Sequence, residues 1–218
     1  MKDLPLISCL MLTKNRYQHF KNAVQDYVAQ DYVKKELIII NNGSFLYKLL
    51  VRSFLKKINQ NIIYVETDPL SIGELRNLGL SKCSGEFIAI FDDDDRHRYD
   101  RLSAQLDICL KSNVTGTLLK NFVAVQGSKR TLCNIRHGLD GTLLFRNPYG
   151  YIKYTDINQG EDTAFIKMLK EKGYVIIILE LEHELYEYHF HGKNTVPLEH
   201  FKKIAKNQET TIKKEIDL

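Results

Sequence analysis

Short apolar runs alternate with amphipathic segments along the first half of the chain. Four runs rich in β-branched or aromatic residues are typical of buried strands. After the first run, apolar residues recur every three or four positions, which predicts a helix with those side chains facing a sheet. This alternation predicts a parallel sheet covered by helices. The expected strands span residues 6–12, 37–40, 62–65 and 87–91, and the helical positions are Tyr17, Phe20, Val24 and Val28.

The rest of the chain continues this pattern but becomes less regular in its second half. Small and polar residues at 41–44 favour a turn, after which we expect a loop. We therefore predict an α/β fold with a central, mostly parallel but mixed sheet flanked by helices. The further helices are expected at about residues 75–80, 99–109 and 162–172, and the further strands at about 117–125, 142–145 and 175–181.

Composition adds little to this picture except by exclusion. Apolar residues make up 44% of the 218 positions and charged residues 27%, as in ordinary globular domains. The formal net charge of +4, from 31 basic and 27 acidic side chains, is too small to indicate a nucleic-acid partner. No two of the four cysteines form a C-x-x-C pair, so we expect buried thiols in a reducing compartment. These cysteines are Cys9, Cys83, Cys109 and Cys133.

The sequence also carries no recognisable membrane-spanning or secretory segment. The apolar stretch at residues 4–12 is short, contains Pro5 and Ser8, and has no small-residue cleavage site after it. No other run approaches the roughly 18 apolar residues of a transmembrane helix. We therefore expect a cytoplasmic protein, with peripheral attachment to the inner face of the membrane left open.

Four consecutive aspartates, Asp92 to Asp95, follow the strand at 87–91. Neighbouring carboxylates repel by roughly 4 kcal/mol per close pair at an effective dielectric near 20, so a positive partner is expected. Ligands of open α/β sheets bind beyond the carboxyl ends of the strands, where these residues fall. Mg²⁺ or Mn²⁺ would suit the oxygen ligands. A solvated acidic turn, capping the next helix through Asp95 or Asp100, explains the aspartates equally well.

Further motifs occur in a fixed order along residues 5–195, and together they resemble the family 2 glycosyltransferases of the GT-A fold. The resemblance implies an enzyme that moves a sugar from a nucleotide diphosphate-sugar to an acceptor hydroxyl. We predict one domain over residues 1–218, with a nucleotide-sugar half at about 1–112, an acceptor half at about 113–195 and a tail at about 196–218. The motifs span residues 5–16, 30–44, 73–79, 84–89 leading into the aspartates, 160–162 and 191–195.

In this family the aspartate motif holds the metal that bridges the donor diphosphate. By resemblance, Asp94 is the direct ligand of Mn²⁺ or Mg²⁺, and Asp92 and Asp93 belong to the donor site. A run of four acids allows more than one register, so Asp93 and Asp95 stay ambiguous. His191 resembles a late histidine of the family that is sometimes a further metal ligand, and neutral imidazole can serve in that way.

The Gly160-Glu161-Asp162 segment resembles the family motif that carries the general base. The resemblance gives Asp162 the role of taking the proton from the acceptor hydroxyl, which implies an inverting single displacement. Glu161 is a further candidate. Acids favoured by the helix dipole are the ordinary alternative for such a pair. The acceptor is expected to be a saccharide or a glycolipid, as in surface polysaccharide or glycolipid synthesis.

The remaining candidates belong to donor binding. The resemblance favours a UDP-sugar donor. Many relatives carry Asp-Asp-Gly-Ser, whose aspartate commonly recognises uracil, where this chain has Asn-Asn-Gly-Ser at 41–44, so thymidine and guanine nucleotides stay open. Cationic side chains can contact phosphate, although they can equally be solvated surface charges. The nucleotide candidates are Thr13, Asn15, Arg16, Asn41 and Gly43, the phosphate candidates are Arg76 and Lys193, and Asn194 is a further candidate.

Other enzyme classes fit the sequence less well. The first strand is not followed by G-x-G-x-x-G and no G-x-x-x-x-G-K is present, which disfavours a dinucleotide-binding dehydrogenase and a P-loop ATPase. Asp95-Arg96 stands where an aspartate-nucleophile phosphohydrolase would carry Thr or Val. The stronger alternative is a non-catalytic relative that binds a nucleotide-sugar or a partner protein without turnover.

Overall fold

The computed structural model describes residues 4–192 and 194, and its centre is one nine-stranded sheet. The strands are β1 (Ile7–Thr13), β2 (Lys35–Asn41), β3 (Ile62–Glu66), β4 (Phe87–Ile90), β5 (Arg96–His97), β6 (Gly116–Gln126), β7 (Lys129–Arg146), β8 (Ile176–Leu179) and β9 (Tyr186–Phe190). The helices are α1 (Tyr17–Ala29), α2 (Phe45–Leu55), α3 (Ile72–Leu80), α4 (Arg101–Lys111) and α5 (Glu161–Glu171).

The sheet is mixed, as the sequence predicts, and its order is β3-β2-β1-β4-β7-β6-β9-β5, with β8 paired to β6. The first four of these strands are parallel. Thr13 at the end of β1 pairs with Asn41, and Asn41 pairs with Glu66. The carboxyl ends of these strands therefore meet at one edge of the sheet. The aspartates that follow β4 emerge at the same edge.

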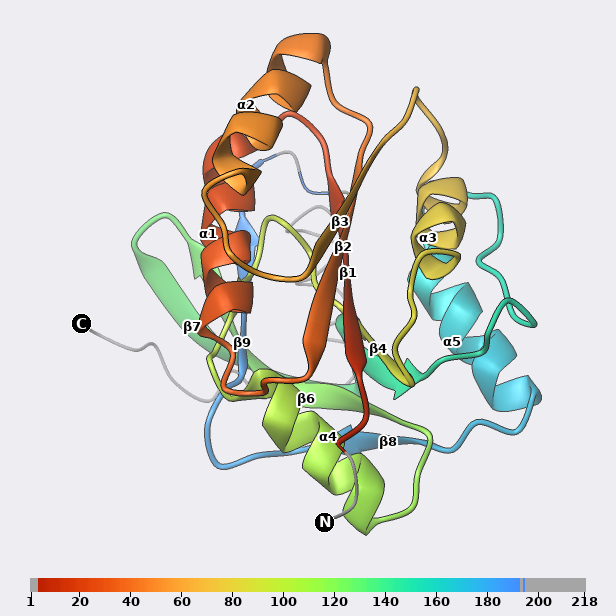
Figure 1. Ribbon diagram of the computed structural model, residues 1–218. Helices are drawn as coiled ribbons and strands as arrows, with labels where there is room; N and C mark the ends of the chain where they lie inside the picture. Colours follow the sequence, from red (N-terminus) through yellow and green to blue (C-terminus); the bar gives the residue numbers. More distant parts are fainter. Residues whose placement is uncertain (1–3, 193, 195–218) are drawn as a thin grey trace.

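Helices cover both faces of the sheet. Figure 1 shows α1 and α2 on one side and α3 and α5 on the other. Alternate residues of the parallel strands point to opposite faces, so Cys9 and Met11 join the core under α1 and α2, whereas Leu10 joins the core under α3 and α5. Leu102 of α4 packs into the first of these cores. The central stretches of β1 and β2, at residues 9–12 and 37–40, are wholly apolar, as expected for a sheet covered on both faces.

The second half returns to the same edge by antiparallel and parallel pairings. β7 pairs antiparallel with both β4 and β6, and register irregularities interrupt its pairing with β6. β9 then runs parallel to β6 and pairs antiparallel with the short β5, which directly follows the aspartates. This arrangement brings the segment after β9 beside the aspartate loop.

Several details differ from the sequence predictions. Val28 does not face the sheet, because it is 38% exposed and Tyr27 is buried in its place. Residues 45–55 form α2 and not a loop. The expected strand at 142–145 is the end of the 18-residue β7, and neither β5 nor β9 was expected. The apolar stretch at 4–12 contains β1.

Within the described part of the chain, no helix combines the length and apolarity that crossing a membrane would require. The four cysteines are free thiols. Cys9, Cys109 and Cys133 are buried as predicted, and Cys83 is partly buried.

Candidate active site

Two arginines neutralise the aspartate loop. Arg76 of α3 is buried and donates from Nη2 to Asp92 Oδ1 over 2.8 Å. Arg16, at the start of α1, places Nη2 2.5 Å from Asp93 Oδ1 and contacts Asp94 through Nη1. Burial disfavours charge on Arg76, but its acidic neighbours outweigh burial and hold its pKa well above the ordinary value. The repulsion expected from the sequence is thus offset by side chains of this chain.

The surroundings of the two middle aspartates, Asp93 and Asp94, shift their pKa values in opposite directions. Burial raises the pKa of Asp93 to about 8, although Arg16 acts in the other direction. Asp94 is also buried, yet its bonds to His191 and its proximity to Arg16 lower its pKa below the ordinary value. Asp94 is therefore the middle carboxylate that stays charged at neutral pH.

Asp94 and His191, the two predicted metal ligands, lie together. His191 Nε2 is 3.0 Å from Asp94 Oδ2, and the ring of His19 lies tilted beside that of His191, with 5.1 Å between the centroids. Within residues 4–192 and 194, no group of three or more His, Cys, Asp or Glu side chains is arranged so that it could hold a metal ion. A carboxylate and an imidazole nevertheless fit Mn²⁺ or Mg²⁺ when substrate oxygens and water complete its coordination. Asp94 and His191 therefore suit a metal ion that the protein would share with a phosphate ligand.

Asp162 lies in the first turn of α5 and faces Arg76. The preceding Gly160 has φ +76°, a left-handed conformation that glycine adopts without strain and that lets the helix begin there. Asp162 Oδ2 is 3.6 Å from Arg76 Nη2, and its buried Oδ1 has no hydrogen-bond partner among the residues that the structure describes. Burial raises the pKa of Asp162 to about 7, Arg76 counteracts this, and Asp92 and Glu161 raise it further. A carboxylate with this pKa can accept a proton near neutral pH.

Polar residues at the ends of β1 and β2 are joined directly to each other. Asn15 has φ +55°, and its Oδ1 accepts a hydrogen bond from the Ser44 amide over 2.8 Å. The hydroxyl of Thr13 bonds to the hydroxyl of Tyr47. Side chains expected to lie near the nucleotide therefore converge, and α2 contributes to the same edge.

The side chain of Asn41 is engaged within the protein. It is buried, donates from Nδ2 to the Tyr64 hydroxyl over 2.8 Å, and accepts the Gly43 amide over 2.8 Å. A methyl group at Gly43 would overlap Tyr47 Cδ1 and stand 2.9 Å from Asn15 Oδ1, so the turn leaves no room for a side chain at this position. Recognition of a base by Asn41 stays a prediction, and the observed role of this residue is to fix the turn.

Asp95 does not cap the next helix. The residue before α4 is Asp100, and its side chain makes no capping hydrogen bond. Asp95 is buried, accepts the Tyr186 hydroxyl at Oδ2 and accepts the His189 amide at Oδ1 over 2.8 Å. It thereby ties β9 to the aspartate loop and sets the position of His191, two residues beyond His189.

Replacing Tyr186 with Phe is expected to destabilise the fold by about 1–3 kcal/mol, because Asp95 Oδ2 loses its hydrogen-bond donor in a buried place. The measurement is urea unfolding at equilibrium. Tyr151→Phe is the matched control, since Tyr151 is 91% exposed. Equal stability of the two variants would show that the Tyr186 hydroxyl does not secure β9.

The end of the histidine motif is arranged by Asn194. Its Oδ1 accepts the His191 amide over 2.9 Å, and its Nδ2 donates to the His189 carbonyl over 2.8 Å. The turn that carries His191 is therefore held from both sides. Lys193, a phosphate candidate, lies outside the described residues.

Sequence reasoning missed residues that shape the site from the second half of the chain. Gly141 of β7 lies against Asp92, since an added Cβ would be 3.0 Å from Asp92 Oδ2. Tyr154 is buried, its hydroxyl finds no hydrogen-bond partner in the described part of the chain, and its ring stacks on Phe165 with 3.9 Å between the centroids. No motif contains either residue, and a glycine within a strand is the sole signal that pointed to a close approach.

Comparison with solved structures identifies the fold. S. aureus TarS (residues 1–349) in complex with UDP matches with a TM-score of 0.69 and 19% identity, covering 92% of this chain and 63% of that one. The mannosyltransferase PcManGT from Pyrobaculum calidifontis, in complex with GDP-Man and Mn²⁺, matches with a TM-score of 0.72 and 15% identity, covering 88% and 59%. The architecture is that of the GT-A glycosyltransferases.

The chain belongs to glycosyl transferase family 2, whose family model matches residues 8–174. WcaA of Escherichia coli (strain K12), named for colanic acid biosynthesis, is 34% identical over 108 residues, covering 49% of this chain and 38% of that protein. TuaG of Bacillus subtilis (strain 168), named for teichuronic acid biosynthesis, is 24% identical over 187 residues, covering 78% and 74%. The chain thus spans less than two thirds of the E. coli relative and of TarS.

Proposed function

We propose that this protein is a metal-dependent, inverting glycosyltransferase that moves a sugar from a nucleotide diphosphate-sugar to an acceptor hydroxyl. The observation that carries the proposal is Asp162, a carboxylate with pKa raised to about 7 that lies beside Arg76 at the edge where ligands of such sheets bind. Membership of the family supports the same activity.

In the proposed reaction Asp162 is the general base. The acceptor oxygen forms a bond to the anomeric carbon while the bond from that carbon to the diphosphate oxygen breaks. The acceptor proton passes to Asp162, and the nucleoside diphosphate leaves with the bonding electrons. A single displacement of this kind inverts the anomeric centre. Arg76, held between Asp92 and Asp162, keeps a positive charge beside the base and the donor.

Asp94 and His191 are the residues that would hold Mn²⁺ or Mg²⁺, with the donor diphosphate completing the coordination. A bound divalent cation supplies Lewis-acid stabilisation of the departing diphosphate. Arg16, which contacts Asp93 and Asp94, is placed to receive a phosphate oxygen when the loop binds its ligands. The GDP-Man and Mn²⁺ of the mannosyltransferase complex are compatible with this assignment.

For the donor, we favour a UDP-sugar, with thymidine and guanine nucleotides as alternatives. The UDP complex of TarS supports the first choice, and the GDP-Man complex of PcManGT supports guanine. The names of the bacterial relatives support a saccharide or glycolipid acceptor in surface polysaccharide synthesis. We further propose that the enzyme works in the cytoplasm, at the inner face of the membrane.

A thermal-shift panel of UDP, GDP, dTDP and CDP, each with Mn²⁺ and with chelator, tests the proposal. Binding at about a hundred times Kd adds about 2.7 kcal/mol, which corresponds to roughly 5–10 °C for a chain of this size. We expect one nucleotide to give this shift, and only with metal. Stabilisation by none of them would favour the non-catalytic alternative.

A further inference from the structure

Helix α2 presents an apolar face to solvent. Phe45 and Leu46 are each 71% exposed, Leu50 is 50% exposed and Leu49 is 42% exposed, all within the first half of the helix. The opposite face is buried through residues such as Val51. The helix therefore carries apolar side chains on its exposed face as well as on the face that packs against the core. Clustered exposed apolar side chains of this kind mark an interaction surface.

Basic side chains accompany this apolar face, which we call the α2 surface and define as Phe45, Leu46, Leu49 and Leu50. Helix α2 contains no acidic residue, and four basic residues lie on it or directly after it. The neighbouring Glu66 is neutralised by a two-pronged contact with one of them. A partner that buries the α2 surface therefore meets an excess of positive charge. The four basic residues are Lys48, Arg52, Lys56 and Lys57.

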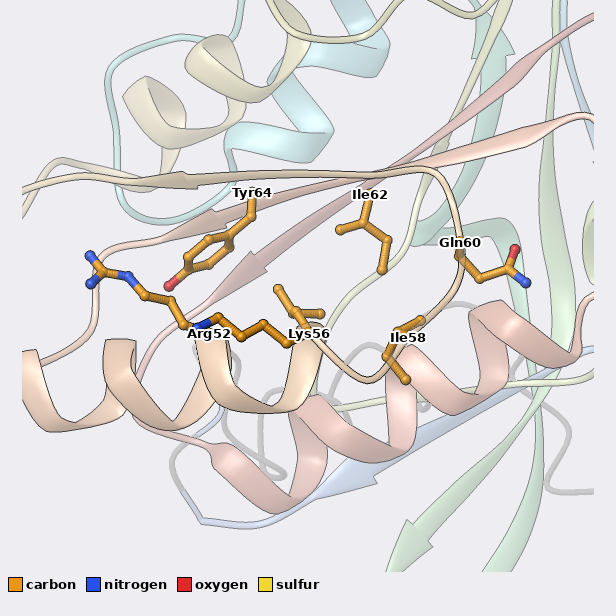
Figure 2. Close-up of a pocket in the computed structure, with 7 residues that line it drawn as sticks. Arg52, Lys56, Ile58, Gln60, Ile62 and Tyr64 are labelled. Atoms are coloured by element: carbon orange, nitrogen blue, oxygen red, sulfur yellow. The ribbon is translucent and has the colours of Figure 1, made fainter.

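A groove continues from the C-terminal end of the helix. The cavity between α2 and β3 has a volume of about 350 Å³. Figure 2 shows the side chains that line it. Apolar side chains form much of its lining, and two cationic side chains stand at its edge (Figure 2). A groove with an apolar lining and positive charge at its edge suits an amphiphile with an anionic headgroup. The lining residues are Arg52, Leu55, Lys56, Ile58, Gln60, Ile62 and Tyr64.

We propose that the α2 surface docks onto an anionic phospholipid bilayer. Phe and Leu side chains would enter the boundary between headgroups and acyl chains, and the adjacent Lys and Arg side chains would meet the phosphates. A bilayer fits better than a second protein chain because the surface lies on one convex helix with positive charge beside it. Long basic side chains can also reach headgroups while their stems stay apolar.

Docking in this way would place the nucleotide edge of the sheet near the membrane. Helix α2 begins after Ser44, whose amide is bonded to Asn15, and the hydroxyl of its Tyr47 contacts Thr13. The α2 surface and the nucleotide residues are therefore joined within one rigid turn. A glycolipid acceptor would reach the site without leaving the bilayer. This consequence rests on the proposed function, whereas membrane binding itself does not.

Cosedimentation of the full chain with vesicles tests the proposal. We expect binding to vesicles of phosphatidylcholine mixed with phosphatidylglycerol, and much weaker binding to phosphatidylcholine alone. Leu46→Gln with Leu49→Gln should weaken binding at least about tenfold, because two apolar side chains no longer leave water. Lys56→Gln with Lys57→Gln should weaken it by about fivefold per charge, and added salt should do the same.

The matched control is Val33→Gln with Leu110→Gln, which removes exposed apolar side chains elsewhere, 79% and 49% exposed. This variant should bind vesicles like the unmodified protein. Equal binding by the Leu46/Leu49 variant, or no binding to anionic vesicles, would overturn the proposal. So would a dimer in light scattering that the same variant dissociates, because a second copy would then cover the α2 surface. Nucleotide thermal shifts, measured in parallel, separate failure of the docking proposal from failure of the proposed activity.

Discussion

Asp162→Asn is expected to lower sugar transfer at least about a hundredfold while leaving nucleotide affinity nearly unchanged, because the amide cannot accept the acceptor proton. Asparagine keeps the shape of the side chain at the start of α5. Arg76 retains Asp92 as its closer partner, at 2.8 Å compared with 3.6 Å to Asp162. The measurements are single-turnover transfer and nucleotide binding on the same preparation.

The same variant makes a prediction about pH. The base must be ionised, so transfer by the unmodified protein should rise with pH through about 7, the raised pKa of Asp162. Any residual transfer by the variant should lack this step. Both rates are to be measured across that pH range at saturating donor.

The folding stability of the unmodified protein should fall as the pH rises through this range, whereas its transfer rate should rise. Burial raises the pKa of Asp162 from 3.8 in the unfolded chain to about 7 in the folded protein. The contribution of Asp162 to folding stability is therefore complete below pH 3.8 and is lost as the pH rises through about 7. Asparagine does not ionise, so it does not bring the cost of a buried charge. Above that pH, Asp162→Asn should therefore stabilise the fold by roughly 1–3 kcal/mol.

Glu161→Gln is the matched control, since it neutralises the adjacent carboxylate in the same helical turn. It should retain most of the transfer activity and the pH step. If Asp162→Asn stayed active, or if Glu161→Gln abolished transfer to the same extent, the assignment of the base would be wrong.

The sequence predicts the first half of the fold well because β1, β2 and β4 are largely apolar and buried, β3 is an apolar run that is partly buried, and the helices present apolar faces to the sheet. Helix α2 is not expected from the sequence because the turn residues at 41–44 predict a loop, although Ser44 caps the helix and its buried residues Tyr47 and Val51 stand at helical spacing. In β9, Tyr186, Tyr188 and Phe190 alternate with polar residues, which is typical of a half-buried strand. Its place beside the aspartate loop depends on the contact of Asp95 with His189, two residues far apart in the chain, and this pairing leaves no local signal.

In the candidate site, too, the sequence indicates the residues with local motifs but not the contacts that depend on the fold. Motifs located Asp94, His191 and Asp162, and the fold brings the first two within 3.0 Å. The sequence indicates Arg16 and Arg76 only as candidates for donor binding, and their pairing with the aspartates follows from tertiary contacts that no motif encodes. A pKa depends on burial, which no short motif encodes.

Asp94→Ala is expected to remove the part of nucleotide affinity that depends on metal, by at least about tenfold, because it deletes the ionised carboxylate of the predicted pair. Affinity measured in chelator should stay the same or increase. Arg16 now divides its contacts between Asp93 and Asp94, and losing one of them leaves more of its charge for a phosphate oxygen. Calorimetric titration of the nucleotide with Mn²⁺ and with chelator measures both effects.

Two further variants complete this test. Asp107→Ala removes an exposed acid on α4 that pairs with Lys111, and it should leave both affinities unchanged. His191→Ala should lower the metal-dependent increment less than Asp94→Ala, because a neutral imidazole contributes no net charge to the cation. If Asp94→Ala kept the full metal-dependent increment, the aspartate loop would bind metal in another register, with Asp92 as the ligand. Equal losses in Asp94→Ala and His191→Ala would instead mean that the cation requires both ligands at once.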